Sequence, residues 1–109
     1  MTSACPETVL YSALGADPDL IEIVEMFVDE MPDRIAAIQR LLDAQDWAAL
    51  RRTAHQLKGA AGSYGFDAVS PQATAVEDAN HNQQPEEQVR AAVAELLDLC
   101  RRVRAGAPG

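Results

Sequence analysis

Several features are scarce in this chain of 109 residues, and each absence excludes a class of protein. Cysteine occurs only at Cys5 and Cys100, which lie at opposite ends without the spacing of a metal site or a disulfide framework. No apolar run approaches the roughly 20 residues that cross a bilayer. The N-terminus also lacks the basic segment and apolar core of a signal peptide. We therefore expect a soluble protein of the reducing cytoplasm that does not contact membranes.

Positive charge is scarce as well. The chain has 17 acidic and 9 basic residues, and its formal net charge is -8 at pH 7. Such a surface would repel a phosphate backbone, so nucleic acid is not an expected partner. The basic residues are nonetheless unevenly placed, because Arg51, Arg52 and Lys58 surround His55. This cluster is either an ordinary solvated helix face or a binding surface.

Strands have little support, since long β-branched runs with alternating polarity are missing. The residues that break helices gather at 15–18, 62–65, 80–85 and 106–109. With 48% hydrophobic residues, a chain of this length supplies one modest core. We therefore expect a single all-α domain over residues 1–109, with its bundle at about 18–104 and a tail at 105–109.

The first predicted helix starts at Asp17-Pro18, where the aspartate can cap free N–H groups and the proline suits the first helical position. It ends near Ala44. Pro32 lies inside it, where the missing N–H should kink the helix or divide it into two shorter ones. The inward positions recur every three or four residues and are Leu20, Val24, Phe27, Val28, Met31, Ile35, Ile38 and Leu42.

Three further helices are predicted. The second is capped by Asp46 and interrupted at 62–65, the third covers 67–80 or begins at Ser70-Pro71, and the fourth opens at Pro85. Short connections make neighbouring helices antiparallel, which predicts an up-down four-helix bundle. The segment Pro6 to Leu14 could add a short capping helix. The inward positions are Trp47, Leu50, Ala54, Leu57, Ala61, Phe66, Val69, Ala73, Val76, Val89, Val93, Leu96, Leu97, Cys100 and Val103.

His55 is predicted to face solvent. When the second helix is projected at about 100° per residue, its apolar residues share one side and His55 lies well outside them. Gly59 follows on the same side, although glycine inside a helix costs about 1 kcal/mol relative to alanine. Either a partner approaches the backbone closely there, or the glycine eases helix packing beside an ordinary surface histidine.

An exposed imidazole next to a lysine suits phosphoryl chemistry. Neutral imidazole can use one nitrogen as a nucleophile while an acceptor holds the other. Lys58 can place a positive charge beside a phosphoryl oxygen, and phosphoryl transfer demands mainly positioning and charge compensation. The sequence has no P-loop and no kinase-type glycine-rich motif, so we do not expect it to bind ATP.

The run AHQLKGAAGSYGF at residues 54–66 resembles the signature of the histidine phosphotransfer (HPt) family, in which an H-x-L-K-G core precedes small residues and a further glycine. It is especially similar to the phosphotransfer domains of chemotaxis-type histidine kinases. The similarity extends over roughly residues 8 to 104, from the long first helix with its proline, through Asp46-Trp47, to Glu77.

The resemblance implies a role for individual residues. His55 matches the phosphoaccepting histidine, Lys58 the lysine that neutralises the phosphoryl group, and Gly59 the glycine that leaves room for a receiver domain. Glu77 matches the glutamate that orients the imidazole, a position where many family members have glutamine. The alternative for Glu77 is an ordinary exposed carboxylate. Arg51, Arg52 and Gly62 are expected to complete the partner-binding surface.

Two positions depart from this pattern. Chemotaxis-type domains can carry a second histidine three residues before the glutamate, where this chain has Thr74, so a relay through that position is in doubt. His81 matches no functional position and is interpreted as a surface histidine. His55 and His81 lack the spacing of metal ligands, so no metal is expected.

We expect a phosphorelay intermediate that exchanges a phosphoryl group with response-regulator receiver domains, or takes it directly from a histidine kinase. It would be a stoichiometric carrier rather than an enzyme, a monomer, and without a cofactor, since any Mg²⁺ would belong to the receiver. Two alternatives stay open. The chain could be a docking module that regulates a partner without phosphotransfer, or the phosphoacceptor domain excised from a larger histidine kinase.

Overall fold

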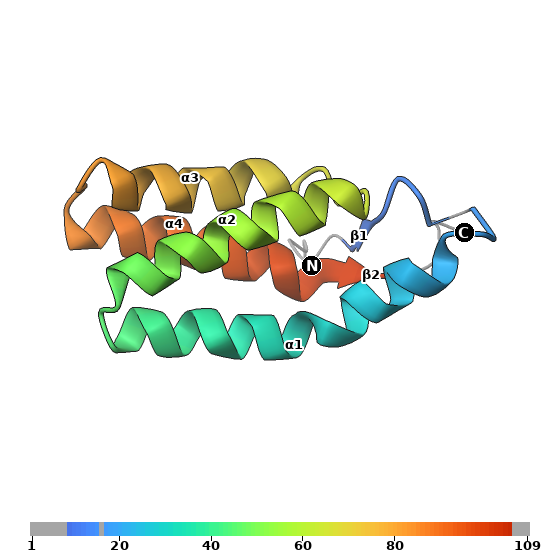
Figure 1. Ribbon diagram of the computed structural model, residues 1–109, viewed down its shortest axis with the longest axis horizontal. Coiled ribbons are helices and arrows are strands. Elements are labelled where there is room, and N and C mark those ends of the chain that lie inside the picture. The colour runs from blue at the N-terminus through green and yellow to red at the C-terminus, as the bar shows by residue number, and fades with distance from the viewer. Residues whose placement is uncertain (1–8, 16, 106–109) are drawn as a thin grey trace, which may run out of the picture.

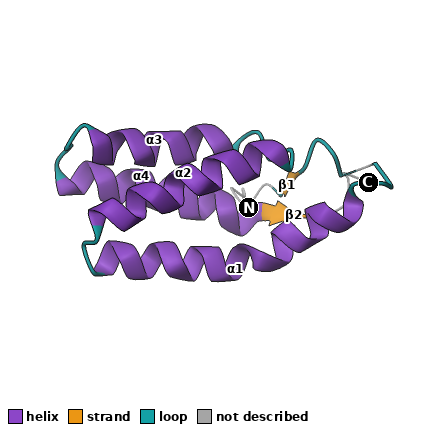
Figure 2. Cartoon of the chain, in the orientation of Figure 1, coloured by secondary structure: helices purple, strands orange, loops and turns teal. Residues whose placement is uncertain are grey.

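The computed structural model describes residues 9–15 and 17–105. In chain order its elements are β1 (Leu10–Tyr11), α1 (Ile21–Asp43), α2 (Trp47–Ser63), α3 (Val69–His81), α4 (Glu86–Arg102) and β2 (Val103–Arg104). Consecutive helices run antiparallel, and α4 also packs against α1, so the helices close into a bundle (Figures 1 and 2). The prediction of an all-α, up-down four-helix bundle is confirmed.

α1 begins at Ile21, later than the predicted start at Pro18. The side chain of Asp17 accepts a hydrogen bond from the backbone N–H of Asp19 at 2.9 Å, and its carbonyl accepts from Leu20 and Ile21. Asp17 therefore closes a turn ahead of the helix, which is a common use of aspartate, instead of capping the helix itself. Leu20 occupies the N-cap position without a side-chain hydrogen bond.

α1 continues through Pro32 as one helix, which excludes the alternative of two shorter helices. Figure 1 shows the helix changing direction along its length, as expected where a proline removes a backbone hydrogen bond. The predicted inward stripe is confirmed at the five fully buried positions, whereas the three others are half-buried. The buried residues are Val24, Phe27, Met31, Ile38 and Leu42, and the half-buried ones are Leu20, Val28 and Ile35.

α2 starts as predicted, because the carboxylate of Asp46 accepts a hydrogen bond from the backbone N–H of Ala49 at 3.2 Å. Its buried residues are Leu50, Ala54, Leu57 and Ala61. Trp47 was predicted to be buried too, but it lies in the first turn at the end of the bundle and is only half-buried. The side of α2 that lies opposite its four buried residues is free to carry polar side chains.

The connection from α2 to α3 turns sharply at Gly65, whose φ is +81°. α3 then begins at Val69, between the two predicted starts, so Phe66 is buried ahead of the helix and not within it. The ring of Phe66 stacks on that of Phe27 with 5.3 Å between centroids, which packs this turn against α1.

α4 starts after Pro85, as predicted. Its inward residues Val89, Val93, Leu96, Leu97 and Cys100 are buried. Val103 is buried as well, but it lies beyond the helix in β2, with an extended φ of -68° and ψ of 141°. Within residues 9–15 and 17–105, no helix combines the length and apolar composition that a membrane span requires.

The predicted capping helix at Pro6 to Leu14 is wrong over its described part. Leu10–Tyr11 forms β1, which pairs in parallel with β2 because the extended chain after α4 leaves backbone groups that need partners. The hydroxyl of Ser12 donates to the carbonyl of Tyr64, and the N–H of Ala13 donates to that of Gly65. Residues 6–8 of this prediction, and residues 106–109 of the predicted tail, lie outside the described part of the chain.

Candidate functional site

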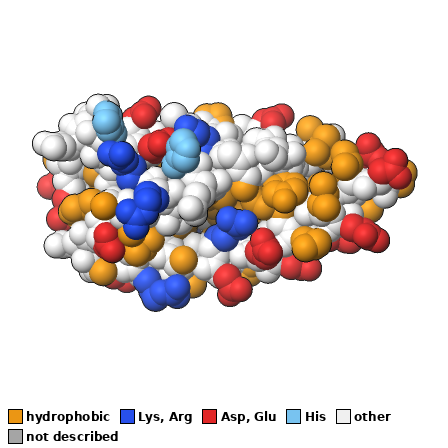
Figure 3. Space-filling view, viewed as in Figure 1, with side chains coloured by type: hydrophobic (Ala, Val, Ile, Leu, Met, Phe, Trp, Pro, Cys, Tyr) orange, Lys and Arg blue, Asp and Glu red, His pale blue; other side chains and the backbone are white. Residues whose placement is uncertain are grey.

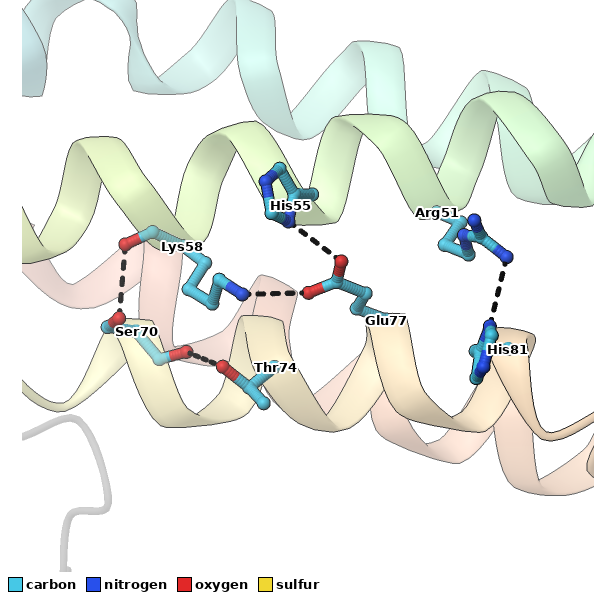
Figure 4. A network of polar contacts seen from close by, with 7 residues as sticks. All are labelled: Arg51, His55, Lys58, Ser70, Thr74, Glu77 and His81. Carbon is cyan, nitrogen blue, oxygen red and sulfur yellow. Dashed lines mark hydrogen bonds and ion pairs between the residues drawn. The ribbon is translucent and has the colours of Figure 1, made fainter.

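His55 projects from the solvent side of α2, and 62% of its side chain is exposed. Its neighbours Ala54 and Leu57 are buried on the opposite side of the same helix. The apolar stripe of α2 therefore determines which way the imidazole faces. Figure 4 shows the ring on α2, with its dashed contact leading towards α3.

Glu77 reaches His55 from α3. Its Oε2 lies 2.7 Å from Nδ1 of the imidazole. Because an ionised carboxylate can only accept, the hydrogen in this contact belongs to Nδ1. In the neutral ring the lone pair is then on Nε2, the nitrogen that can act as a nucleophile.

Lys58 contacts the same carboxylate, with its Nζ 3.0 Å from Oε1 of Glu77. Each oxygen of Glu77 thus accepts from a different residue of α2 (Figure 4). The hydrogen bond from Lys58, more than the contacts with His55, holds the pKa of Glu77 below its ordinary value of 4.5, while burial opposes this shift. Glu77 is therefore ionised at neutral pH, as an acceptor for Nδ1–H must be.

Ser70 ties α3 to the turn of α2 that contains Lys58. Its hydroxyl donates to the backbone carbonyl of Lys58 at 3.0 Å. Thr74, where related sequences can have a second histidine, donates its hydroxyl to the carbonyl of Ser70 at 3.1 Å (Figure 4). The Thr74 hydroxyl is therefore engaged within its own helix, and no contact joins it to His55.

Gly59 lies one helical turn beyond His55, on an open surface. A Cβ added there would meet no atom within 4 Å. The packing of this chain therefore provides no reason for a glycine at this position. At Gly62 the nearest atom to an added Cβ is the hydroxyl oxygen of Ser70 at 3.7 Å, an ordinary contact distance, so the space beside Gly62 is bounded by α3.

Arg51 lies one turn before His55, and its Nη1 is 3.2 Å from Nδ1 of His81 (Figure 4). His81 is exposed, in agreement with its interpretation as a surface histidine, but its contact with Arg51 was not predicted. The signal was present in the helix register, because residues 51 and 81 stand four positions from 55 and 77 in opposite directions, as facing positions of antiparallel helices do. Arg52 is exposed and has no polar contact within the described residues.

His55 lies on an open face of the bundle (Figure 3). Among the described residues there is no group of three or more His, Cys, Asp or Glu side chains that could hold a metal ion. A hollow of about 400 Å³ lies at the end of the bundle between Trp47, Asn80 and Val89, among others, and His55 does not line it. Figure 3 shows both imidazoles and several basic side chains on one open face. Any reaction of His55 therefore takes place on a bundle wall.

Comparison with known proteins gave one match. The family model described as the Hpt domain matches residues 22–106, a range that contains all four helices except Ile21 at the start of α1, together with His55, Lys58 and Glu77. No curated protein and no solved structure matched the chain.

Proposed function

This chain belongs to the Hpt domain family, and on that premise we propose that His55 is the residue that accepts and passes on a phosphoryl group. Membership in the family implies histidine phosphotransfer in phosphorelay signalling, a role in which such domains contact histidine kinases and response regulators. The residue, the donor and the acceptor are parts of the proposal. We assign the donor and acceptor as receiver domains, with a histidine kinase as the alternative donor.

The observation that best supports His55 is the 2.7 Å contact between its Nδ1 and Glu77 on a ring that is mostly exposed. This contact keeps hydrogen on Nδ1, so Nε2 can attack the phosphorus of an aspartyl phosphate on the receiver. The P–N bond forms as the P–O bond to the aspartate breaks, and the aspartate leaves as a carboxylate. Transfer to a second receiver reverses these steps.

Lys58 would compensate the charge of the phosphoryl group. It stands three residues after His55, a spacing at which side chains on a helix are neighbours. A lysine on a flexible stem can move its ammonium group from Glu77 towards a phosphoryl oxygen. Such charge compensation and positioning are the main demands of phosphoryl transfer.

The open space at Gly59 supports close approach by a partner. We include Arg51, Arg52 and Gly62 in the partner-binding surface. In this scheme the protein is a monomeric, cytoplasmic carrier that acts stoichiometrically, with no ATP site or cofactor of its own. Any Mg²⁺ would be bound by the receiver.

Phosphotransfer from a radiolabelled receiver tests the assignment. We expect the wild type to become labelled and His55→Gln to remain unlabelled. His81→Gln is the matched control, since it removes an exposed imidazole one turn along the same seam but leaves His55 in place, and it should still become labelled. Equal labelling of the wild type and His55→Gln would end the assignment and favour a docking module without phosphotransfer.

A further inference from the structure

α2 differs in charge from the rest of the chain. From Trp47 to Ser63 it has three basic residues and no acidic one, although the whole chain has 17 acidic and 9 basic residues. Three of the five basic side chains on α1 and α4 pair with a carboxylate four residues earlier on their own helix. These pairs are Arg34 with Glu30 at 3.3 Å, Arg90 with Glu86 at 2.6 Å and Arg102 with Asp98 at 3.3 Å.

Arg51 and Arg52 have no such carboxylate among the described residues. The guanidinium of Arg51 instead contacts Nδ1 of His81 at 3.2 Å. A guanidinium can only donate, so Nδ1 accepts and the neutral ring carries its hydrogen on Nε2. The contact holds Arg51 in place without neutralising its charge, and it leaves the Nε2–H of His81 as a donor.

These residues make the face around His55 asymmetric. Arg51 and His81 lie about 6 Å from the His55–Glu77 pair along the seam of α2 and α3, since four helical residues rise by that amount. In the opposite direction Gly59 is bare, with no atom within 4 Å of an added Cβ. We call the two sides the cationic end (Arg51 and Arg52, with the neutral ring of His81 beside them) and the bare end (Gly59).

A receiver that exchanges a phosphoryl group with His55 must bring an aspartate to it. The site around that aspartate holds Mg²⁺, a hard cation that proteins bind through carboxylate oxygens. The carboxylates that bind this ion would make the surroundings of the site acidic, and a cationic surface beside His55 is complementary to them. Charged groups at the rim of an interface act mainly by steering association and by determining the orientation of the partner.

We propose that Arg51, Arg52 and His81 bind carboxylates on the rim of the receiver's phosphorylation site. The receiver then lies across the seam in one orientation. Its acidic rim lies over the cationic end, and the part of the receiver that approaches the α2 backbone most closely lies over the bare end. This inference rests on the proposed function, because it takes His55 as the point where the two proteins meet. It adds a partner-recognition role for His81 and a direction for docking.

The test compares Arg51→Glu with Arg40→Glu. Both replace one positive charge by a negative one, but Arg40 is exposed on α1 and its side chain has no polar contact within the described residues. The probe is whichever receiver of the source organism accepts phosphate fastest from the wild type. We expect Arg51→Glu to lower the second-order transfer rate about tenfold at low ionic strength and to flatten its salt dependence. Arg40→Glu should change the rate by less than about twofold.

Two measurements keep the result interpretable. Arg52→Glu is a second variant for the case in which Arg51→Glu disturbs the helix, because the side chain of Arg52 has no polar contact in the described region. It should also lower the transfer rate. Chemical phosphorylation with phosphoramidate, in which Nε2 displaces ammonia from phosphorus, should still label His55 in both variants and so shows that the nucleophile is intact. Normal chemical labelling with equal transfer rates for the α2 variants and Arg40→Glu would overturn the inference alone. Failure of every receiver to exchange phosphate with the wild type would overturn the proposed function as well.

Discussion

Replacing Gly59 with alanine should stabilise the protein. The residue is exposed in the interior of α2, and its added Cβ would meet no atom within 4 Å, so alanine causes no clash. Glycine in a helix interior is less stable than alanine by roughly 0.5–1 kcal/mol, because it loses more backbone entropy on folding. For a domain of about 100 residues this corresponds to a rise in Tm of roughly 2–8 °C.

Urea denaturation measures this change. We expect the unfolding midpoint of Gly59→Ala to rise while the m-value is unchanged, since the surface exposed on unfolding is nearly the same. Gly65→Ala is the matched contrast. The φ of Gly65 is +81° and its added Cβ would lie 2.6 Å from the hydroxyl oxygen of Ser12, so we expect a loss of about 1–3 kcal/mol.

A larger side chain at position 59 should affect function. Gly59→Leu should fold as well as the wild type but transfer phosphate to a receiver more slowly, because leucine fills the space that a partner would occupy. A Gly59→Ala protein less stable than the wild type would refute the reasoning, since the glycine would then serve the chain's own structure. Normal transfer by Gly59→Leu would refute the docking explanation only.

Two further predictions concern single ionisable groups. The pKa of Glu77 is lowered in the folded protein, so the stability it contributes is complete above pH 4.5 and is lost as pH falls through the lower folded value. Urea titrations at several acidic pH values should therefore show a shallower acid loss for Glu77→Gln, and identical profiles would contradict this. Burial raises the pKa of the Cys100 thiol to about 12, and the residue is 1% exposed. In a Cys5→Ser variant a thiol-specific reagent at pH 8 should react only after unfolding, and rapid native reaction would contradict the burial.

Short-range patterns were enough to predict α2 and the exposure of His55. The Asp46 cap acts within the first turn, and the spacing of Leu50, Ala54 and Leu57 defines the buried side whatever packs against it. An imidazole outside that stripe must face away from the core. The start of α1 was harder, because Asp17 can satisfy either a helix end or the turn in front of it, and both use the same side-chain oxygen.

Contacts between helices were less accessible. Apolar spacing places Glu77 on α3 but does not say which residue of α2 it meets, and only the resemblance to a known family suggested His55. The Arg51–His81 contact does not follow from the apolar spacing of either helix, since it depends on the register between two helices. The pairing of Leu10–Tyr11 with the chain after α4 was missed for the same reason, and a helix was predicted in its place.

By itself the sequence determined the number of helices, their buried sides and the outward position of His55. These follow from interactions between residues three or four positions apart, which any helix of this composition would make. Only the tertiary structure decided that Glu77 spans His55 and Lys58, that His81 meets Arg51, and that β1 pairs with β2. Those contacts depend on how far one element slides along another, a choice made by the packing of the whole core.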